Sequence, residues 1–134
     1  MTPSSEDRLV RIVVAVFAVE QLALGALMAV APGSFFHHVG PFGLRNDHYI
    51  RDSSTWSLAL GAALLIALRR PRWRVPVLAF AALQAALHAL NHLADIGKAH
   101  PRYVGPLDFG LLALTAVLLA YVARRAAGGG ETAQ

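Results

Sequence analysis

The chain has 134 residues, of which 56% are hydrophobic and 15% charged, and its mean hydropathy is +0.50. It is far more apolar than an average soluble domain, so the composition indicates a single integral membrane domain. The formal net charge of +4 gathers at the ends of apolar segments, which indicates membrane orientation rather than nucleic-acid binding. The sequence has no cysteine, which excludes disulfides, iron–sulfur clusters and thiol chemistry, so any metal would be held by nitrogen and oxygen.

Four apolar segments each reach the roughly 20 residues that a helix needs to cross the hydrocarbon core of a bilayer. They cover residues 9–31, 48–68, 75–96 and 104–123. The pattern predicts an all-α fold, an integral membrane four-helix bundle over residues 1–127 that runs up, down, up and down. The small and polar residues 128–134 are expected to form a disordered tail.

The first segment has a second interpretation as a secretory signal. Basic residues precede it, and Ala29-Val30-Ala31 has the small-x-small form of a cleavage site. Its apolar run is longer than the core of a usual signal, which favours a permanent helix. Glu20 lies near the middle of this segment, where a carboxylate is expected to be protonated or paired with a cation such as Arg51.

The basic residues are divided unevenly between the two sides of the predicted bundle. The positive-inside rule assigns the side with more Lys and Arg to the cytoplasm. Both termini are therefore expected in the cytoplasm, with the protein in the cytoplasmic (inner) membrane and the loop over residues 32–45 on the outer membrane surface. The side of the termini has eight basic residues (Arg8, Arg11, Arg69, Arg70, Arg72, Arg74, Arg124 and Arg125), and the other side has four (Arg45, Arg51, Lys98 and Arg102).

Polar side chains gather at one end of the second and third apolar segments. Successive residues of a helix turn by about 100°, so each group forms a stripe on one helix face. The short connection over residues 69–74 makes the two helices antiparallel neighbours, so the stripes are expected to meet in the outer-leaflet half. The stripes comprise His48, Arg51 and Asp52 on the second helix, and His88, Asn91, His92 and Asp95 on the third.

Two pairs of candidate metal ligands have the i, i+4 spacing that places side chains on one helix face. These pairs are His48 with Asp52 and His88 with His92. Three imidazoles and one carboxylate would suit zinc, iron or copper, with haem as a less favoured cofactor. The alternative is a hydrogen-bonded and ion-paired network that only holds the helices together. The residue types leave both interpretations open.

Other polar residues are candidates for ligand binding or proton relay. Glu20 could store or relay a proton, and Arg51 could steer an anion or neutralise a carboxylate. Asn91 and Asp95 could orient the metal ligands through hydrogen bonds. Asp108 is interpreted as a charge that favours the start of the fourth helix. No catalytic residue is assigned, because the sequence has no phosphate loop, nucleophile elbow or dinucleotide fingerprint.

Residues 42–52, 58–61 and 88–92, with their Asn-Asp-His, Arg-Asp and His-Ala-Leu-Asn-His segments, resemble small uncharacterised four-helix membrane proteins that are grouped with the DoxX-like set. DoxX-like proteins are associated with quinone-linked membrane oxidoreduction. The resemblance therefore implies the four-helix layout and favours quinone-linked redox chemistry. It transfers no catalytic residue to this chain.

The sequence thus predicts a membrane protein whose histidine-rich pocket binds a metal ion or a small polar ligand, in quinone-linked redox chemistry. One alternative is a non-catalytic accessory or assembly subunit of a membrane complex, and another is a binder of lipid or of another hydrophobic ligand. Because so small a bundle has little interior, a homo-oligomer or a larger complex is expected. Membrane lipid is an expected partner, and nucleic acid is not.

Overall fold

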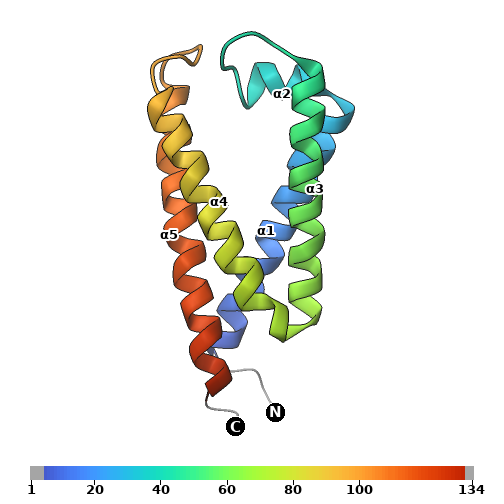
Figure 1. Ribbon diagram of the computed structural model, residues 1–134, viewed down its shortest axis with the longest axis vertical. Helices are drawn as coiled ribbons and strands as arrows, with labels where there is room; N and C mark the ends of the chain where they lie inside the picture. The colour runs from blue at the N-terminus through green and yellow to red at the C-terminus, as the bar shows by residue number, and fades with distance from the viewer. Residues whose placement is uncertain (1–4, 132–134) are drawn as a thin grey trace.

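The computed structural model describes residues 5–131, which contain no β-strand apart from one isolated bridge between Phe42 and Ala99. The all-α prediction is confirmed. The four long helices run alternately up and down, so η1 lies at the same end of the molecule as the start of α1 and the end of α5 (Figure 1). We call this the turn end, and the opposite end, which carries α2, the loop end. The elements are α1 (Ser5–Val30), α2 (Pro32–His38), α3 (Asp47–Arg69), the 3₁₀ helix η1 (Pro71–Trp73), α4 (Arg74–Ala94) and α5 (Val104–Glu131).

Local sequence explains where the helices begin and end. Pro32 follows α1 and is the first residue of α2, a position that suits proline because it needs no backbone N–H donor. Asn46 caps α3, since its side-chain oxygen accepts hydrogen bonds from the backbone N–H groups of His48 at 3.1 Å and Tyr49 at 3.2 Å. The cap fixes the start of α3 directly after the loop that follows α2.

Two segments differ from the sequence prediction. The sequence predicts a loop over residues 32–45, but Pro32–His38 forms the short helix α2. The sequence also predicts a disordered tail over residues 128–134, but α5 continues to Glu131. Each residue added to an existing helix gains a hydrogen bond without a new nucleation step, so the helix extends past its apolar part. Residues 132–134 of the predicted tail lie outside the described residues.

The long helices pack as two close pairs, α1 with α3 and α4 with α5. Two glycines explain the first pair. A Cβ atom at Gly25 would lie 2.8 Å from Cγ of Leu58, and one at Gly61 would lie 2.7 Å from Cγ of Leu22. Larger residues at these two positions would push the helices apart. The α1–α3 pair therefore uses the small-residue packing common between membrane helices.

The buried core lies in the half of the molecule nearest the turn end. Its largest fully buried side chains come from all four long helices: Val14, Leu64, Leu78, Leu119 and Val122. These residues lie close to η1 along α3 and α4, and toward the chain ends along α1 and α5. The two helix pairs are therefore joined at the turn end.

The helix pairs separate toward the loop end (Figure 1). The sequence predicts α3 and α4 as neighbours, but they make few contacts with each other, whereas α3 packs extensively on α1. A short turn joins only the adjacent ends of two helices, and side-chain packing decides which partner each helix keeps along its length. The predicted packing of α3 against α4 along their length is thus corrected, because the four long helices form two pairs that meet at one end.

Within residues 5–131, three helical segments are long and apolar enough to cross a membrane: Arg8–Val30, Pro71–Ala94 and Val104–Gly128. The sequence predicts a fourth span over residues 48–68, and this segment is not among the three. Its first half contains Arg51, Asp52 and several Ser and Thr residues, which lower its hydropathy. The composition and length of the other helices indicate a membrane protein.

Candidate functional site

A cavity of about 750 Å³ opens between the two helix pairs. All four long helices contribute to its wall, and Phe35 of α2 reaches it as well. Its volume lies within the range of small-molecule binding sites. The cavity exists because α3 and α4 diverge beyond the core, which leaves no helix to fill the space between the pairs. We call it the interpair cavity.

The wall of the interpair cavity is mainly apolar, with large side chains such as Phe17 of α1, Trp56 of α3 and Phe80 of α4. A smaller number of polar side chains interrupts it. An apolar wall with a few converging polar groups is the usual composition of a ligand site. The polar members are Glu20 and Gln21 on α1, Ser53 and Ser57 on α3, Gln84 and His88 on α4, and Thr115 on α5.

Glu20 contributes a carboxyl group to the cavity wall, and the neighbouring Gln21 hydrogen-bonds to it. The sequence predicts Arg51 or a histidine as the cation that pairs with Glu20. Within residues 5–131, however, no salt bridge joins Glu20 to a basic side chain, and Arg51 is exposed on α3. The Glu20 carboxyl group is therefore available to a molecule in the cavity.

His88 starts a chain of polar groups that leads from the cavity to α5. Its Nε2 lies 3.1 Å from Nε2 of His92, at hydrogen-bond distance. Nδ1 of His92 is buried and lies 3.9 Å from a carboxylate oxygen of Asp108, with side-chain exposures of 15% and 23%. At this distance the contact is electrostatic rather than a hydrogen bond. His88, His92 and Asp108 thus connect α4 with α5 beside the cavity.

The predicted residues on α3 lie elsewhere. His48 Nε2 is 3.4 Å from a carboxylate oxygen of Asp52, but the two side chains are 78% and 62% exposed. Neither residue lines the interpair cavity, whose α3 wall begins with Tyr49 and Ile50. Arg51 is exposed as well. The predicted polar stripe of α3 therefore faces the surroundings of the molecule rather than α4.

The remaining predicted residues also stay outside the cavity. Asn91 is exposed on α4, and Asp95 forms a salt bridge of 2.6 Å with Lys98. At the start of α3, Arg45 holds the pKa of Asp47 below its usual range by hydrogen bonding to its carboxylate, at 2.6 Å from Nε. These ion pairs are local, between residues two or three positions apart, so they do not connect the two helix pairs.

The four predicted metal ligands form two separate pairs. His48 and Asp52 lie on α3, which packs with α1, whereas His88 and His92 lie on α4, which packs with α5. Within the described part of the chain, no group of three or more His, Asp or Glu side chains is placed to hold a metal ion. The predicted metal site requires α3 and α4 to stay side by side beyond η1, and their divergence separates the two pairs of residues.

The loop after α2 contacts α4 and the loop between α4 and α5 at the loop end. Phe42 packs edge-on against the ring of His92, with 4.8 Å between ring centroids. Phe42 also forms the isolated bridge with Ala99, and the backbone N–H of His100 donates to the carbonyl of Pro41 at 3.2 Å. This loop therefore ties the α1–α3 pair to the loop between α4 and α5.

Sequence reasoning missed several residues of the site. No sequence motif distinguishes the small polar residues of the cavity wall from others in alanine-rich helices. These residues are Ser53, Ser57 and Thr115. The sequence predicts Asp108 only as a charge at the start of a helix, and its proximity to His92 follows from the packing of α4 on α5. The periodicity of α4, which places Gln84 on the same face as His88, was the available signal for the cavity wall.

The fold and the cavity define the class: a small helical protein with helices suited to crossing a membrane and a cavity between two helix pairs. The chain belongs to the DUF4345 family, a domain of unknown function, whose model matches residues 9–95. The match covers most of α1, with Glu20, and all of α3 and of α4, with Gln84 and His88, and it ends before α5. No curated protein and no solved structure matches the chain. No match links it to the DoxX-like proteins.

Proposed function

We propose that the protein binds a small amphipathic molecule in the interpair cavity. The observation that carries the proposal is the cavity wall itself, about 750 Å³ of mainly apolar space with polar side chains from all four long helices. An apolar body would pack against residues such as Phe17 and Leu24. A polar head would meet the carboxyl, amide and imidazole groups of Glu20, Gln84 and His88.

The chemistry of these three groups narrows the class of ligand. Together they offer hydrogen-bond donors and acceptors at the cavity wall, where Gln84 is half-buried and Glu20 and His88 are exposed. A ligand that left them unpaired would bind less well, because desolvating a polar group without replacing its hydrogen bonds costs free energy. We therefore expect a head group with hydroxyl or carbonyl functions. The divergence of α3 and α4 would let such a molecule enter sideways from the bilayer.

A quinone is one member of this chemical class, since its carbonyl groups accept hydrogen bonds and its tail is apolar. The redox interpretation rests on the DoxX-like resemblance alone and has no support from the site. A metal site has less support than a site for an amphipathic ligand. The divergence of α3 and α4 separates His88 and His92 from His48 and Asp52.

The proposal places the protein in the cytoplasmic (inner) membrane with the turn end and both termini on the cytoplasmic side. The four arginines of residues 69–74 support this orientation by the positive-inside rule. The exposed leucines and valines along α4 and α5, such as Leu87, Leu114 and Val117, would contact lipid or a second copy of the chain. If the protein were instead an accessory subunit that binds no ligand, the same faces of α4 and α5 would contact the partner protein.

The proposal is tested by identifying what the purified protein retains. Wild-type protein and the variants Glu20→Gln and His88→Ala would be extracted in mild detergent, and bound small molecules identified by mass spectrometry. We expect an amphipathic compound in wild type and at least about a tenfold loss in both variants, the equivalent of one lost polar contact. His48→Ala is the matched control, because His48 is exposed outside the cavity.

Two outcomes would contradict the proposal. The first is that wild type and variants retain the same lipids in the same amounts. The second is that His48→Ala loses the compound as fully as His88→Ala, which would indicate a general loss of folding. Metal analysis of the same samples tests the metal interpretation. If His48→Ala and His88→Ala both lost a bound metal ion, the two histidines would have to share one metal site.

A further inference from the structure

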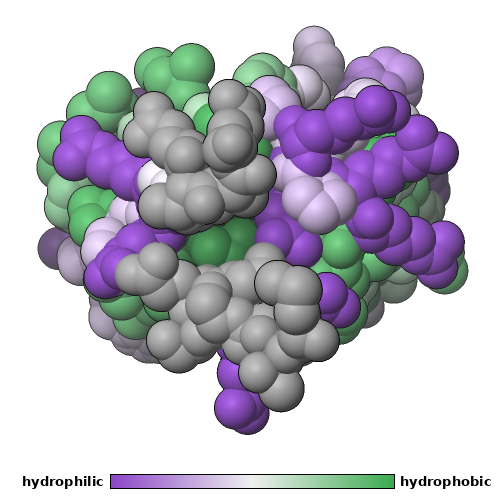
Figure 2. Space-filling model, turned by 90° about the horizontal axis from the view of Figure 1, so that it is seen from below, coloured by the Kyte–Doolittle hydropathy of each residue, from purple (hydrophilic) through white to green (hydrophobic). Residues whose placement is uncertain are grey.

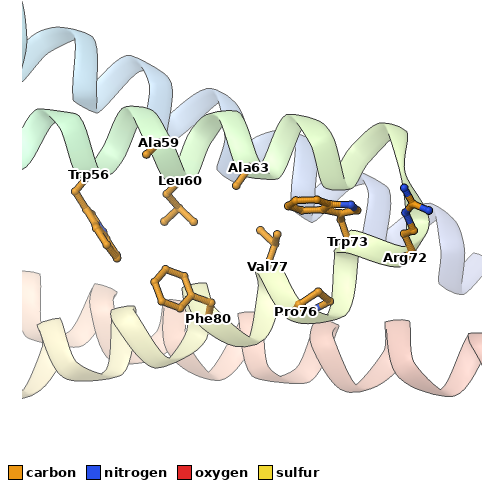
Figure 3. Close-up of a pocket in the computed structure, with 9 residues that line it drawn as sticks. All are labelled: Trp56, Ala59, Leu60, Ala63, Arg72, Trp73, Pro76, Val77 and Phe80. Carbon is orange, nitrogen blue, oxygen red and sulfur yellow. The ribbon is translucent and has the colours of Figure 1, made fainter.

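A second cavity of about 540 Å³ lies between α3 and α4 near the turn end (Figure 3). Its wall includes Ala59 and Ala63 of α3, Trp73 of η1 and Val77 of α4. These side chains are apolar or aromatic. The cavity exists because alanines on α3 face the start of α4 and leave space that larger residues would fill. We call it the turn cavity.

The two ends of the turn cavity have different chemistry. At one end, the rings of Trp56 and Phe80 lie 5.4 Å apart and belong to the walls of both cavities. At the other end lie Trp73 and Arg72, from the 3₁₀ helix that joins α3 to α4 (Figure 3). Arg72 contributes the single charged side chain to this wall as described. The turn cavity is therefore an apolar space with one cationic end.

The surroundings of that cationic end are strongly basic. Arg69, Arg70 and Arg72 are exposed and fall within four residues, and residues 53–94 contain no Asp or Glu. Viewed from the turn end, hydrophilic side chains gather at this end of the molecule with apolar side chains between them (Figure 2). Such a cluster attracts anionic groups at a membrane surface. Trp73, half exposed beside it, has the amphipathic ring that favours the membrane–water interface.

We propose that the turn cavity seats one acyl chain of an anionic phospholipid, with the phosphate of its head group held by Arg72. The space along α3 from Trp56 to Ala63 measures about 10 Å at the helical rise of 1.5 Å per residue, enough for a run of methylene groups. The charge of the arginine cluster selects an anionic head, and the absence of acidic residues from residues 53–94 removes competing partners within this segment. This site adjoins the interpair cavity at Trp56 and Phe80, but it does not depend on the function proposed for that cavity.

Competitive lipid retention tests the proposal. Full-length protein would be equilibrated in bilayer nanodiscs with equal amounts of phosphatidylglycerol and phosphatidylcholine, re-extracted, and analysed by native mass spectrometry. We expect wild type to retain about fivefold more phosphatidylglycerol than phosphatidylcholine, the equivalent of one arginine contact at a membrane surface. Arg72→Gln should abolish that preference, and Ala63→Phe, which fills the cavity, should lower retention of both lipids.

Matched controls distinguish the site from general effects. Ala62→Phe adds the same ring to the neighbouring, exposed position of α3, and Arg124→Gln removes an exposed arginine near the end of α5. Both should behave as wild type. Equal retention of the two lipids by wild type, an undiminished preference in Arg72→Gln, or equal losses in Ala62→Phe and Ala63→Phe would each overturn the proposal. Displacement of phosphatidylglycerol by inorganic phosphate would also overturn it, because the site would then recognise phosphate alone.

Discussion

The turn end and the loop end of the molecule are built from the same four helices but packed in different ways. At the turn end, Leu64, Leu78 and Val122 are fully buried and all four helices meet. Toward the loop end, α3 stays with α1 and α4 stays with α5, and polar residues such as Glu20 and His88 line the space between them. Concentrating the packing at one end lets a chain of this size hold a cavity at the other.

The largest expected effect comes from the packed end. Leu64→Ala removes a fully buried side chain from the core, so we expect a loss of about 3 kcal/mol in the free energy of unfolding, through lost contacts and the cavity left behind. Leu24→Ala, at the wall of the interpair cavity, should cost less than half as much, because that side chain borders empty space. Reversible unfolding in mixed detergent micelles measures both. Equal losses would mean that the two ends are packed alike.

The next effect concerns the glycines that let α1 approach α3. Gly61→Ala places a Cβ against Leu22 at 2.7 Å, so overpacking should lower the free energy of unfolding by about 2 kcal/mol. Gly110→Ala in α5 is the control, since nothing lies within 4 Å of the added atom, and the better helix propensity of alanine should stabilise the protein by up to about 1 kcal/mol. If both substitutions changed the free energy of unfolding in the same direction, the proposed close packing of α1 on α3 at Gly61 would be wrong.

A smaller effect of opposite sign is expected at the interpair cavity. Gln84→Leu replaces a polar group on the cavity wall with an apolar one, so we expect the protein to become more stable by about 1 kcal/mol and to lose its bound ligand. Thermal unfolding and mass spectrometry of the same samples provide the two readouts. A destabilised Gln84→Leu variant would indicate that Gln84 supports the fold rather than a ligand.

The smallest effect is at the exposed start of α3. Because Arg45 lowers the pKa of Asp47 in the folded protein, their pair stabilises it above the unfolded-state pKa of the carboxyl group, and this contribution is lost as pH falls through the lower, folded-state pKa. Arg45→Gln should raise the folded-state pKa of Asp47 toward its ordinary value, measured by NMR titration. Wild type and variant should converge in stability in strong acid, where the carboxyl group is protonated in both states.

The sequence was most informative where apolar runs are long and uninterrupted. Residues 9–31, 75–96 and 104–123 correspond to helices that are long and apolar enough to cross a membrane. It also drew attention to Glu20 and His88, because polar groups inside apolar helices are costly and therefore conspicuous. Both residues line the interpair cavity. The remaining predicted site residues lie outside it, because helix periodicity identifies a face without identifying what that face meets.

By itself the sequence determined that the chain is helical and suited to a membrane, because hydropathy and helix length depend on local composition. Only the tertiary structure decided which helices pair. The glycines at positions 25 and 61 let α1 approach α3 closely, and this packing outweighs the short turn that joins α3 to α4. That choice separates His48 from His88, opens the interpair cavity and leaves the turn cavity beside the arginines, since helix packing depends on side chains far apart in the chain.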